Sequence, residues 1–465
     1  MKLSTLVTTL TLSLALMTTA KLRATDFIHF DTPLYKYRVY LTDKKGTPYS
    51  VKRPEQFLSQ KSIERRKRLK LKVDKHDLPL TPAYVDGIRA KGLRVVNKSK
   101  WNNTLVVETT DSTLAQSLTT LPYVKSVRRV YTRPDSIAAP DTTDRHSRLT
   151  GKLDSTANYY GHGYGQIEML NGLRLHDAGL RGQGMTIAVI DGGFYNADIL
   201  PGLKGTRILG TRNFVNDDPD VYAAHWHGMA VLSCIGARAP YSLVGTAPEA
   251  SFYLLMSEDT PTEHMVEEDN WCAAVEYADS LGVDIITSSL GYYTYDDPAE
   301  SHTYRELDGR TALNSCTASL AASRGILVLN SAGNAGNDRW KKISVPADAT
   351  DILTVGAVDS LRRNTLFSSL GNTADGRIKP DVMALGEGAA AFEVDGSITR
   401  VNGTSFSTPI LCGMVACLWQ AFPDRRPEEV IDAVRRSADN ANHPDNVYGY
   451  GIPDMWKAYQ ILQED

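Results

Sequence analysis

Short apolar runs alternate with helical stretches from Tyr159 onward, and this alternation constrains the fold more than any other feature. Five of the runs have the length of strands buried on both faces: residues 185–190, 251–256, 283–286, 326–329 and 352–355. Helical stretches lie between them, for example at 270–281 and 312–324. The pattern predicts an α/β fold, a mostly parallel sheet with helices on both faces. Catalytic groups in such folds lie at the ends of the strands.

The α/β part is expected to span residues 158–465 and to follow a smaller domain at 25–133. In this smaller domain strand-like runs such as 37–41 and 104–107 alternate with helical runs such as 55–68, which predicts an α+β sheet covered on one face by helices. Residues 134–157 are rich in Pro, Ser, Thr and Asp, and they predict a linker because no periodicity survives there.

Residues 1–24 have the pattern of a signal peptide. Lys2 gives a positive start, an apolar stretch runs from Leu3 to Met17, and small residues follow up to Ala20 and Ala24. The stretch is shorter than the roughly 20 apolar residues that a membrane helix needs. We therefore expect a secreted, periplasmic or cell-envelope protein, and no later segment is apolar enough to span a membrane.

Charge is distributed unevenly along the chain. Between Thr25 and Thr150 there are 25 Lys and Arg against 13 Asp and Glu, whereas the part from Gly151 onward carries a net charge of −18. Opposite charges predict that the two domains attract each other. The basic run at 65–70 would also suit nucleic acid, but the chain has no base-stacking motif, so we expect no nucleic-acid partner.

Five cysteines are present, all in the second half of the chain. Their number is odd and none forms a close CxxC pair, which favours small core residues over a disulfide framework.

Four segments carry the residue types of nucleophilic catalysis. Asp191 and Asn334 each follow an apolar strand, and His227 and Ser405 each precede an apolar helical run. A hydroxyl nucleophile needs a base to take its proton, and the base needs a carboxylate to orient it. The oxyanion that develops needs a donor, which a side-chain amide can supply. The chain offers one candidate for each task.

These segments resemble the subtilisin-like serine proteases. The order Asp, His, Ser is that of the family, and the segment from Gly403 to Pro409, Gly-Thr-Ser-Phe-Ser-Thr-Pro, is its most specific mark. The resemblance covers about residues 160–460. It implies that Ser405 is the nucleophile, His227 the general base, Asp191 its orienting carboxylate and Asn334 the oxyanion donor. It further implies that Ser289, Leu290 and Gly291 form an edge strand that pairs with the substrate backbone.

The family pattern also sets expectations for other positions. Met229 stands two residues after the base, where the family usually has Thr. The primary specificity pocket lies near Ser344 and has no acidic residue at its base, which favours apolar or broad preference. Residues 25–133 resemble the inhibitor-like propeptides of the family, so we expect them to act as an intramolecular inhibitor.

No metal or cofactor is needed for this chemistry. A zinc site on His225 and His227 is the metal alternative, but no third ligand has suitable spacing. Structural calcium is common in the family, and the oxygen-rich run at 216–220 lacks the spacing of a calcium loop, so we interpret it as a solvated surface loop.

The sequence thus predicts a secreted serine endopeptidase that hydrolyses peptide bonds in protein or peptide substrates through an acyl-enzyme. Two alternatives use the same machinery: a relative that only binds peptides, and an esterase or peptide ligase.

Overall fold

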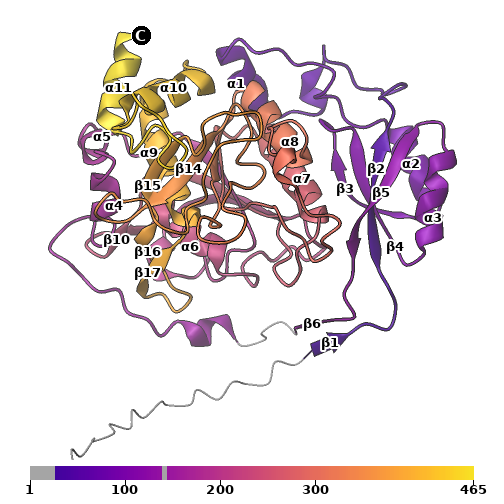
Figure 1. Cartoon of the computed structure of the whole chain (residues 1–465), viewed down its shortest axis with the longest axis horizontal. Helices are drawn as coiled ribbons and strands as arrows, with labels where there is room; N and C mark the ends of the chain where they lie inside the picture. Colours follow the sequence, from indigo (N-terminus) through magenta and orange to yellow (C-terminus); the bar gives the residue numbers. More distant parts are fainter. Residues whose placement is uncertain (1–26, 139–143) are drawn as a thin grey trace, which may run out of the picture.

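A parallel sheet forms the centre of the large domain. The computed structural model describes residues 27–138 and 144–465, and within them this sheet has seven strands (Figure 1). Their spatial order is β15 (Val382–Leu385), β14 (Leu353–Val358), β13 (Leu327–Ser331), β12 (Ile285–Ser288), β7 (Thr186–Asp191), β11 (Ser251–Met256) and β8 (Arg207–Asn213). All neighbouring strands are parallel. The five apolar runs form β7, β11, β12, β13 and β14, which confirms the predicted α/β fold.

Helices cover both faces of this sheet, as the continuous apolar runs of its strands require. Ile187 and Val189 of β7 pack in one cluster with α6 (His227–Gly236) and α9 (Thr404–Ala421). Ala188 and Ile190 pack on the other face with α7 (Val266–Leu281) and α8 (Leu313–Ser323). Successive residues of a strand point to opposite faces, so a strand between two helical layers is apolar throughout.

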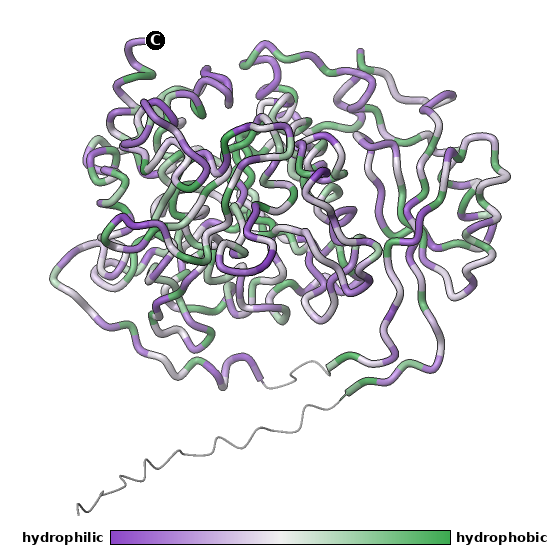
Figure 2. The backbone as a smooth tube through the Cα atoms, in the orientation of Figure 1, coloured by the Kyte–Doolittle hydropathy of each residue, from purple (hydrophilic) through white to green (hydrophobic). Residues whose placement is uncertain are grey.

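Smaller elements complete the large domain. Its other α-helices in the described residues are α4 (Tyr164–Glu168), α5 (Leu173–Asp177), α10 (Pro427–Ser437) and α11 (Met455–Glu464). Two antiparallel pairs lie outside the main sheet: β9 (Arg238–Ala239) with β10 (Leu243–Val244), and β16 (Glu387–Phe392) with β17 (Ile398–Asn402). In Figure 2 many hydrophobic residues lie in the interior of the large domain, whereas many outer loops are hydrophilic.

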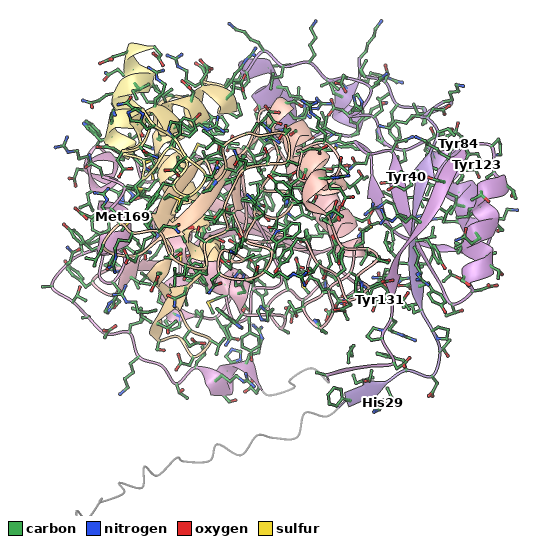
Figure 3. All side chains as sticks on the ribbon, in the orientation of Figure 1. His29, Tyr40, Tyr84, Tyr123, Tyr131 and Met169 are labelled. Carbon is green, nitrogen blue, oxygen red and sulfur yellow. The ribbon has the colours of Figure 1, made fainter. Side chains whose placement is uncertain are left out.

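The N-terminal domain is an antiparallel sheet with the strand order β3 (Arg94–Ser99), β4 (Thr104–Thr109), β2 (Tyr35–Leu41) and β5 (Val124–Thr132). Helices α2 (Pro82–Arg89) and α3 (Ser112–Ser117) cover its outer face, as predicted (Figure 1). Tyr84 and Tyr123 stack on that side with ring centroids 4.3 Å apart (Figure 3). A short pair, β1 (Phe27–His29) with β6 (Ser136–Ala138), extends from the domain. Helix α1 (Gln60–Arg68) instead leaves the sheet and lies against the large domain.

The inner face of the N-terminal sheet packs on α7, and polar and oppositely charged side chains pair across this interface. Arg38 binds Asp269 through two 2.7 Å hydrogen bonds, and both side chains are 3% exposed. Glu276 accepts hydrogen bonds from the hydroxyl of Ser99 and the backbone N–H of Trp101. Tyr131 of β5 meets His264 edge to face, with ring centroids 4.9 Å apart (Figure 3). These contacts agree with the attraction expected from the unequal charges of the two domains.

Several sequence predictions concern segments outside this core. The predicted signal peptide lies outside the described residues. Within the part of the chain that is described, no helix is both long and apolar enough to cross a bilayer. Described residues of the predicted linker are bound to the large domain: Arg145 binds Asp198 at 2.7 Å and the N–H of Gly151 donates to Asp395. All five cysteines are free and four are buried, which confirms that they form no disulfide framework.

Candidate active site

The predicted site residues lie along one edge of the large sheet. Asp191 ends β7, Ser289 follows β12 directly, and Asn334 lies three residues beyond β13. Because these strands are parallel and adjacent, their carboxyl ends meet at the same edge. His227 begins α6, and Ser405 is the second residue of α9.

Asp191 and His227 form a hydrogen-bonded pair, with 2.8 Å between Asp191 Oδ1 and His227 Nδ1. The same carboxylate oxygen accepts the N–H of Gly192 at 2.8 Å. Burial would lower the pKa of His227, but the charge and hydrogen bond of Asp191 outweigh it, so the pKa lies above its ordinary value. A Cβ on Gly228 would stand 2.4 Å from the carbonyl oxygen of Gly193, so glycine lets α6 approach this pair closely.

Ser405 is held against the segment that follows β12, which the structure does not form into the expected edge strand, by a hydrogen bond that a proline makes available. Pro409 lies inside α9 and has no N–H, so it cannot donate to the carbonyl of Ser405 four residues earlier. That carbonyl instead accepts the hydroxyl of Ser289 at 2.8 Å. Helix α9 begins at Thr404, so Ser405 lies within its first turn and not ahead of the helical run, where the sequence analysis expected it.

The hydroxyl of Ser405 donates to the carbonyl of Ser289 at 3.4 Å, a long hydrogen bond. Ser405 is 7% exposed, and the ring of the next residue, Phe406, lies 5.6 Å from that of His227. The structure therefore brings Ser405 beside the Asp191–His227 pair. The described residues show no direct hydrogen bond from Ser405 to His227.

Asn334 faces the turn that carries Ser405. Its Oδ1 accepts the backbone N–H and the hydroxyl of Thr404, at 2.8 and 2.9 Å. These two donors fix the orientation of the amide and leave Nδ2 to donate elsewhere. A Cβ on Gly403 would lie 3.5 Å from Nδ2, which places this donor over the start of α9.

Comparison with known proteins agrees with this geometry. Residues 182–451 match the model described as the subtilase family, and residues 36–146 match the peptidase S8 propeptide domain of Bacteroidota. The chain belongs to the subtilase family. Its N-terminal domain is a propeptide domain of that family, and the match extends beyond the predicted boundary at residue 133.

Individual relatives cover different shares of this subtilase. The serine protease AprX of Bacillus subtilis is 30% identical over 308 residues, which are 58% of this chain and 65% of AprX, so the chain spans less than two thirds of that relative. Subtilisin E of the same species is 29% identical over 337 residues, 70% of this chain and 81% of subtilisin E. The solved structure of the prenylagaramide maturation protease PagA has a TM-score of 0.50 at 22% identity, covers 63% of this chain and 99% of its own, and shares the fold.

A pocket of about 140 Å³ opens beside Ser405 in this subtilase. Two backbone hydrogen bonds between Tyr292 and Val345, of 2.9 and 3.1 Å, hold together the two segments that form the walls of the pocket. Its lining includes no Asp or Glu and comprises Ser289, Gly291, Tyr293, Ser331, Gly333, Asn334, Ala335, Lys342, Ser344, Ser369 and Ser405. The hydroxyl of Ser344 is buried without a hydrogen-bond partner in the described residues. Two of the three predicted edge residues, Ser289 and Gly291, thus line the pocket, and the carbonyl of Leu290 accepts the amide of Asn330 at 3.0 Å.

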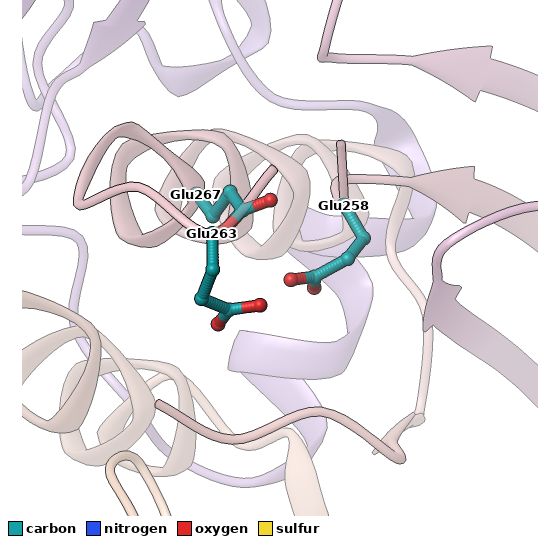
Figure 4. A group of neighbouring side chains, drawn as sticks. All are labelled: Glu258, Glu263 and Glu267. Atoms are coloured by element: carbon teal, nitrogen blue, oxygen red, sulfur yellow. The ribbon is translucent and has the colours of Figure 1, made fainter. Parts of the chain in front are cut away.

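Three carboxylates that the sequence analysis did not single out converge next to the site. Glu258 and Glu263 lie in the loop between β11 and α7, and Glu267 lies in the first turn of α7 (Figure 4). One oxygen of each lies within 4.8 Å of the others, so they could hold a cation. Burial first, and then mutual repulsion, raises the pKa of Glu258 to about 8. A Cβ on Gly192 would lie 3.3 Å from Cβ of Glu258, which places the group beside Asp191. No sequence spacing points to it, because the three residues meet only in the fold.

Two alternatives for metals can be compared with the structure. The backbone N–H of His227 donates to Nδ1 of His225 at 3.4 Å, and Nδ1 of His227 is hydrogen-bonded to Asp191. The run at 216–220 is an exposed loop in which Asn216 and Asp218 each accept the N–H two residues further on. This confirms the interpretation of that run as a surface loop.

Met229, which the sequence analysis singled out two residues after His227, is fully buried in the core.

Proposed function

We propose that this chain is a serine endopeptidase, synthesised as an exported precursor. The observation that carries the proposal is the meeting of a hydrogen-bonded Asp–His pair, a serine and a side-chain amide donor at one edge of the sheet. Export follows from the signal-peptide pattern of residues 1–24. Family membership supports the reaction class, and protein or peptide substrates follow from it.

In the reaction, Ser405 attacks the carbonyl carbon of the scissile peptide bond. His227 takes the hydroxyl proton through Nε2, since its Nδ1 is engaged by Asp191, and later gives that proton to the leaving amine. Asp191 stabilises the imidazolium that forms between these steps. The acyl-enzyme is then hydrolysed by water along the same route.

Two groups act on the substrate and not on the nucleophile. The free Nδ2 of Asn334 and the N–H of Ser405 donate to the oxyanion of the tetrahedral intermediate. The segment from Ser289 to Gly291 pairs with the substrate backbone, and the pocket beside it receives the side chain before the scissile bond. Because the lining residues include Lys342 and no carboxylate, we infer that the pocket does not select cationic side chains.

The propeptide domain is proposed to act as an intramolecular inhibitor of this activity. Support comes from its match to a family propeptide and from the end of β5, where Tyr131 packs on His264 next to the three carboxylates. In the absence of cleavage this contact keeps the domain beside the substrate-binding edge.

The test is Ser405→Ala in the full chain, measured by hydrolysis of a chromogenic peptide amide and by the size of the purified product. We expect turnover to vanish and the precursor to stay uncut. In subtilisin, a member of this family, loss of the serine costs about 10⁶ in kcat, and that magnitude is taken from the relative. Hydrolysis at the wild-type rate by the variant would overturn the assignment.

A further inference from the structure

Helix α1 of the N-terminal domain buries two arginines against the large domain. It carries five Lys or Arg among its nine residues. Arg65 and Arg66 are each 1% exposed. The next two residues, Lys67 and Arg68, are exposed. A buried guanidinium is tolerated only when its donors are paired, so the partners of Arg65 and Arg66 decide what the helix does.

Arg65 reaches three acceptors of the large domain at once. It donates to Asp279 Oδ1 at 2.5 Å and to the carbonyl oxygens of Val283 at 2.5 Å and Arg324 at 3.2 Å. Arg66 donates to the second oxygen of Asp279 at 3.0 Å. Asp279 is fully buried, and the charges of Arg66, Lys100 and Arg65 outweigh its burial and hold its pKa below the ordinary value.

These contacts lie at the amino-terminal edge of the large sheet, opposite the candidate active site. Lys61 binds the hydroxyl of Thr186, the first residue of β7, and lies 3.4 Å from Asp284, which precedes β12. Asp284 itself accepts the N–H of Thr186 at 2.9 Å and so joins β7 to β12. Since β7 rises about 3.3 Å per residue, the five steps from Thr186 to Asp191 separate the two edges by about 17 Å.

Apolar side chains also pack between the end of α1 and the large domain. Leu69, directly after α1, is 2% exposed and belongs to the main core cluster of the large domain. A Cβ on Gly325 would lie 2.6 Å from Cδ1 of Leu69 and 2.9 Å from Cδ1 of Leu71, so the glycine at the start of this edge leaves room for both leucines. The helix is therefore seated in the large domain and does not merely rest on its surface.

We propose that the amino-terminal edge of the catalytic sheet is a docking site for a basic helix, and that its occupant is α1. This site retains the N-terminal domain after the connecting chain is cut, independently of contacts at the substrate-binding edge. The partner is thus defined chemically: a helix with two adjacent arginines for Asp279 and two backbone carbonyls, followed by a leucine for the core.

The experiment uses the full chain with Ser405→Ala and an inserted recognition site for a sequence-specific protease between Ala138 and Asp144. Because the added protease makes the cut, the result does not depend on the proposed activity. The nicked protein is passed over a size-exclusion column, and the dissociation rate of the labelled N-terminal fragment is measured. We expect the fragment to stay bound, with Lys67→Met as the matched control on the exposed side of α1.

The test variant is Arg65→Met with Arg66→Met, which removes both arginines from the buried Asp279 and leaves Lys100, 3.6 Å away, as its remaining cation among the described residues. Removing the hydrogen-bonded partners of a buried charge is strongly destabilising, so we expect the fragment to dissociate on the order of 100-fold faster than in the control. Dissociation at the control rate would overturn the proposal.

Should the double variant not fold, Arg65→Lys gives a second measurement. Lysine keeps the charge but cannot reach three separate acceptors with a planar fork. We expect dissociation to accelerate about tenfold for this variant, a loss of the size that one charge-assisted hydrogen bond supplies. A fragment that leaves no faster than in the Lys67→Met control would equally refute the role of α1.

Discussion

Gly291→Ala tests whether the pocket beside Ser405 selects the substrate side chain. A Cβ at Gly291 would stand 2.1 Å from the hydroxyl oxygen of Ser344 and 3.1 Å from its Cβ, and ordinary contacts of a Cβ begin at 3.4 Å. Rotation of the Ser344 hydroxyl relieves the first contact but not the second, because its Cβ does not move with that rotation. One wall must therefore shift into a pocket of only about 140 Å³.

The size of the effect follows from the volume lost. One methyl group of misfit in a binding pocket is worth roughly 10–200-fold in kcat/KM. We expect kcat/KM to fall by about that factor for a peptide amide with Phe before the scissile bond, and by less than about threefold for the same peptide with Ala there. The two substrates are compared on one enzyme preparation, so partial inactivation cancels from the ratio.

Gly165→Ala is the matched control. Gly165 lies in α4, and a Cβ there would meet nothing within 4 Å. Thermal unfolding of both variants shows whether Gly291→Ala is intact. An unchanged Phe-to-Ala ratio in folded Gly291→Ala would refute the assignment of this pocket to the substrate side chain.

Two further predictions concern the chemistry. For Asn334→Leu we expect kcat to fall with KM barely changed, because its hydrogen bond forms mainly in the transition state; the factor of about 10²–10³ is taken from subtilisin, a member of this family, and an unchanged kcat would contradict the role. For pH, His227 must be neutral to accept the proton of Ser405, and Asp191 holds its pKa above the ordinary value of about 6.5. The rate should therefore be lost as pH falls, with an inflection above 6.5, and a kcat/KM profile that stays flat down to pH 4 would rule out a histidine base.

Local patterns were sufficient to predict five of the seven strands of the main sheet but not β8 or β15. The apolar runs that became β7 and β13 are short and buried on both faces, so the sequence identifies them and the polar residues at their ends. The sequence analysis placed Ser405 ahead of the helix, whereas the structure has it in the first turn of α9. Pro409 lies inside the helix and frees the carbonyl of Ser405 for Ser289. That bond joins segments 116 residues apart, and no local pattern contains it.

Long-range charge pairing accounts for what else the sequence did not predict. By composition the basic run at 65–70 would suit nucleic acid, yet Arg65 and Arg66 are buried against Asp279, more than 200 residues away. Glu258 and Glu267 are a local case: they lie near the two ends of the loop that joins β11 to α7, and the course of that loop brings them together. Burial of charged side chains depends on partners that composition and periodicity do not reveal.

Covalent labelling tests the central claim most directly. The mature form is treated with a serine-directed organofluorophosphate, digested with an added protease and mapped by mass spectrometry. We expect one phosphoryl adduct, on the peptide that contains Ser405, and loss of activity in proportion to its formation. An adduct on another residue, or full hydrolysis by protein that is completely labelled at Ser405, would contradict the assignment of Ser405 as the nucleophile.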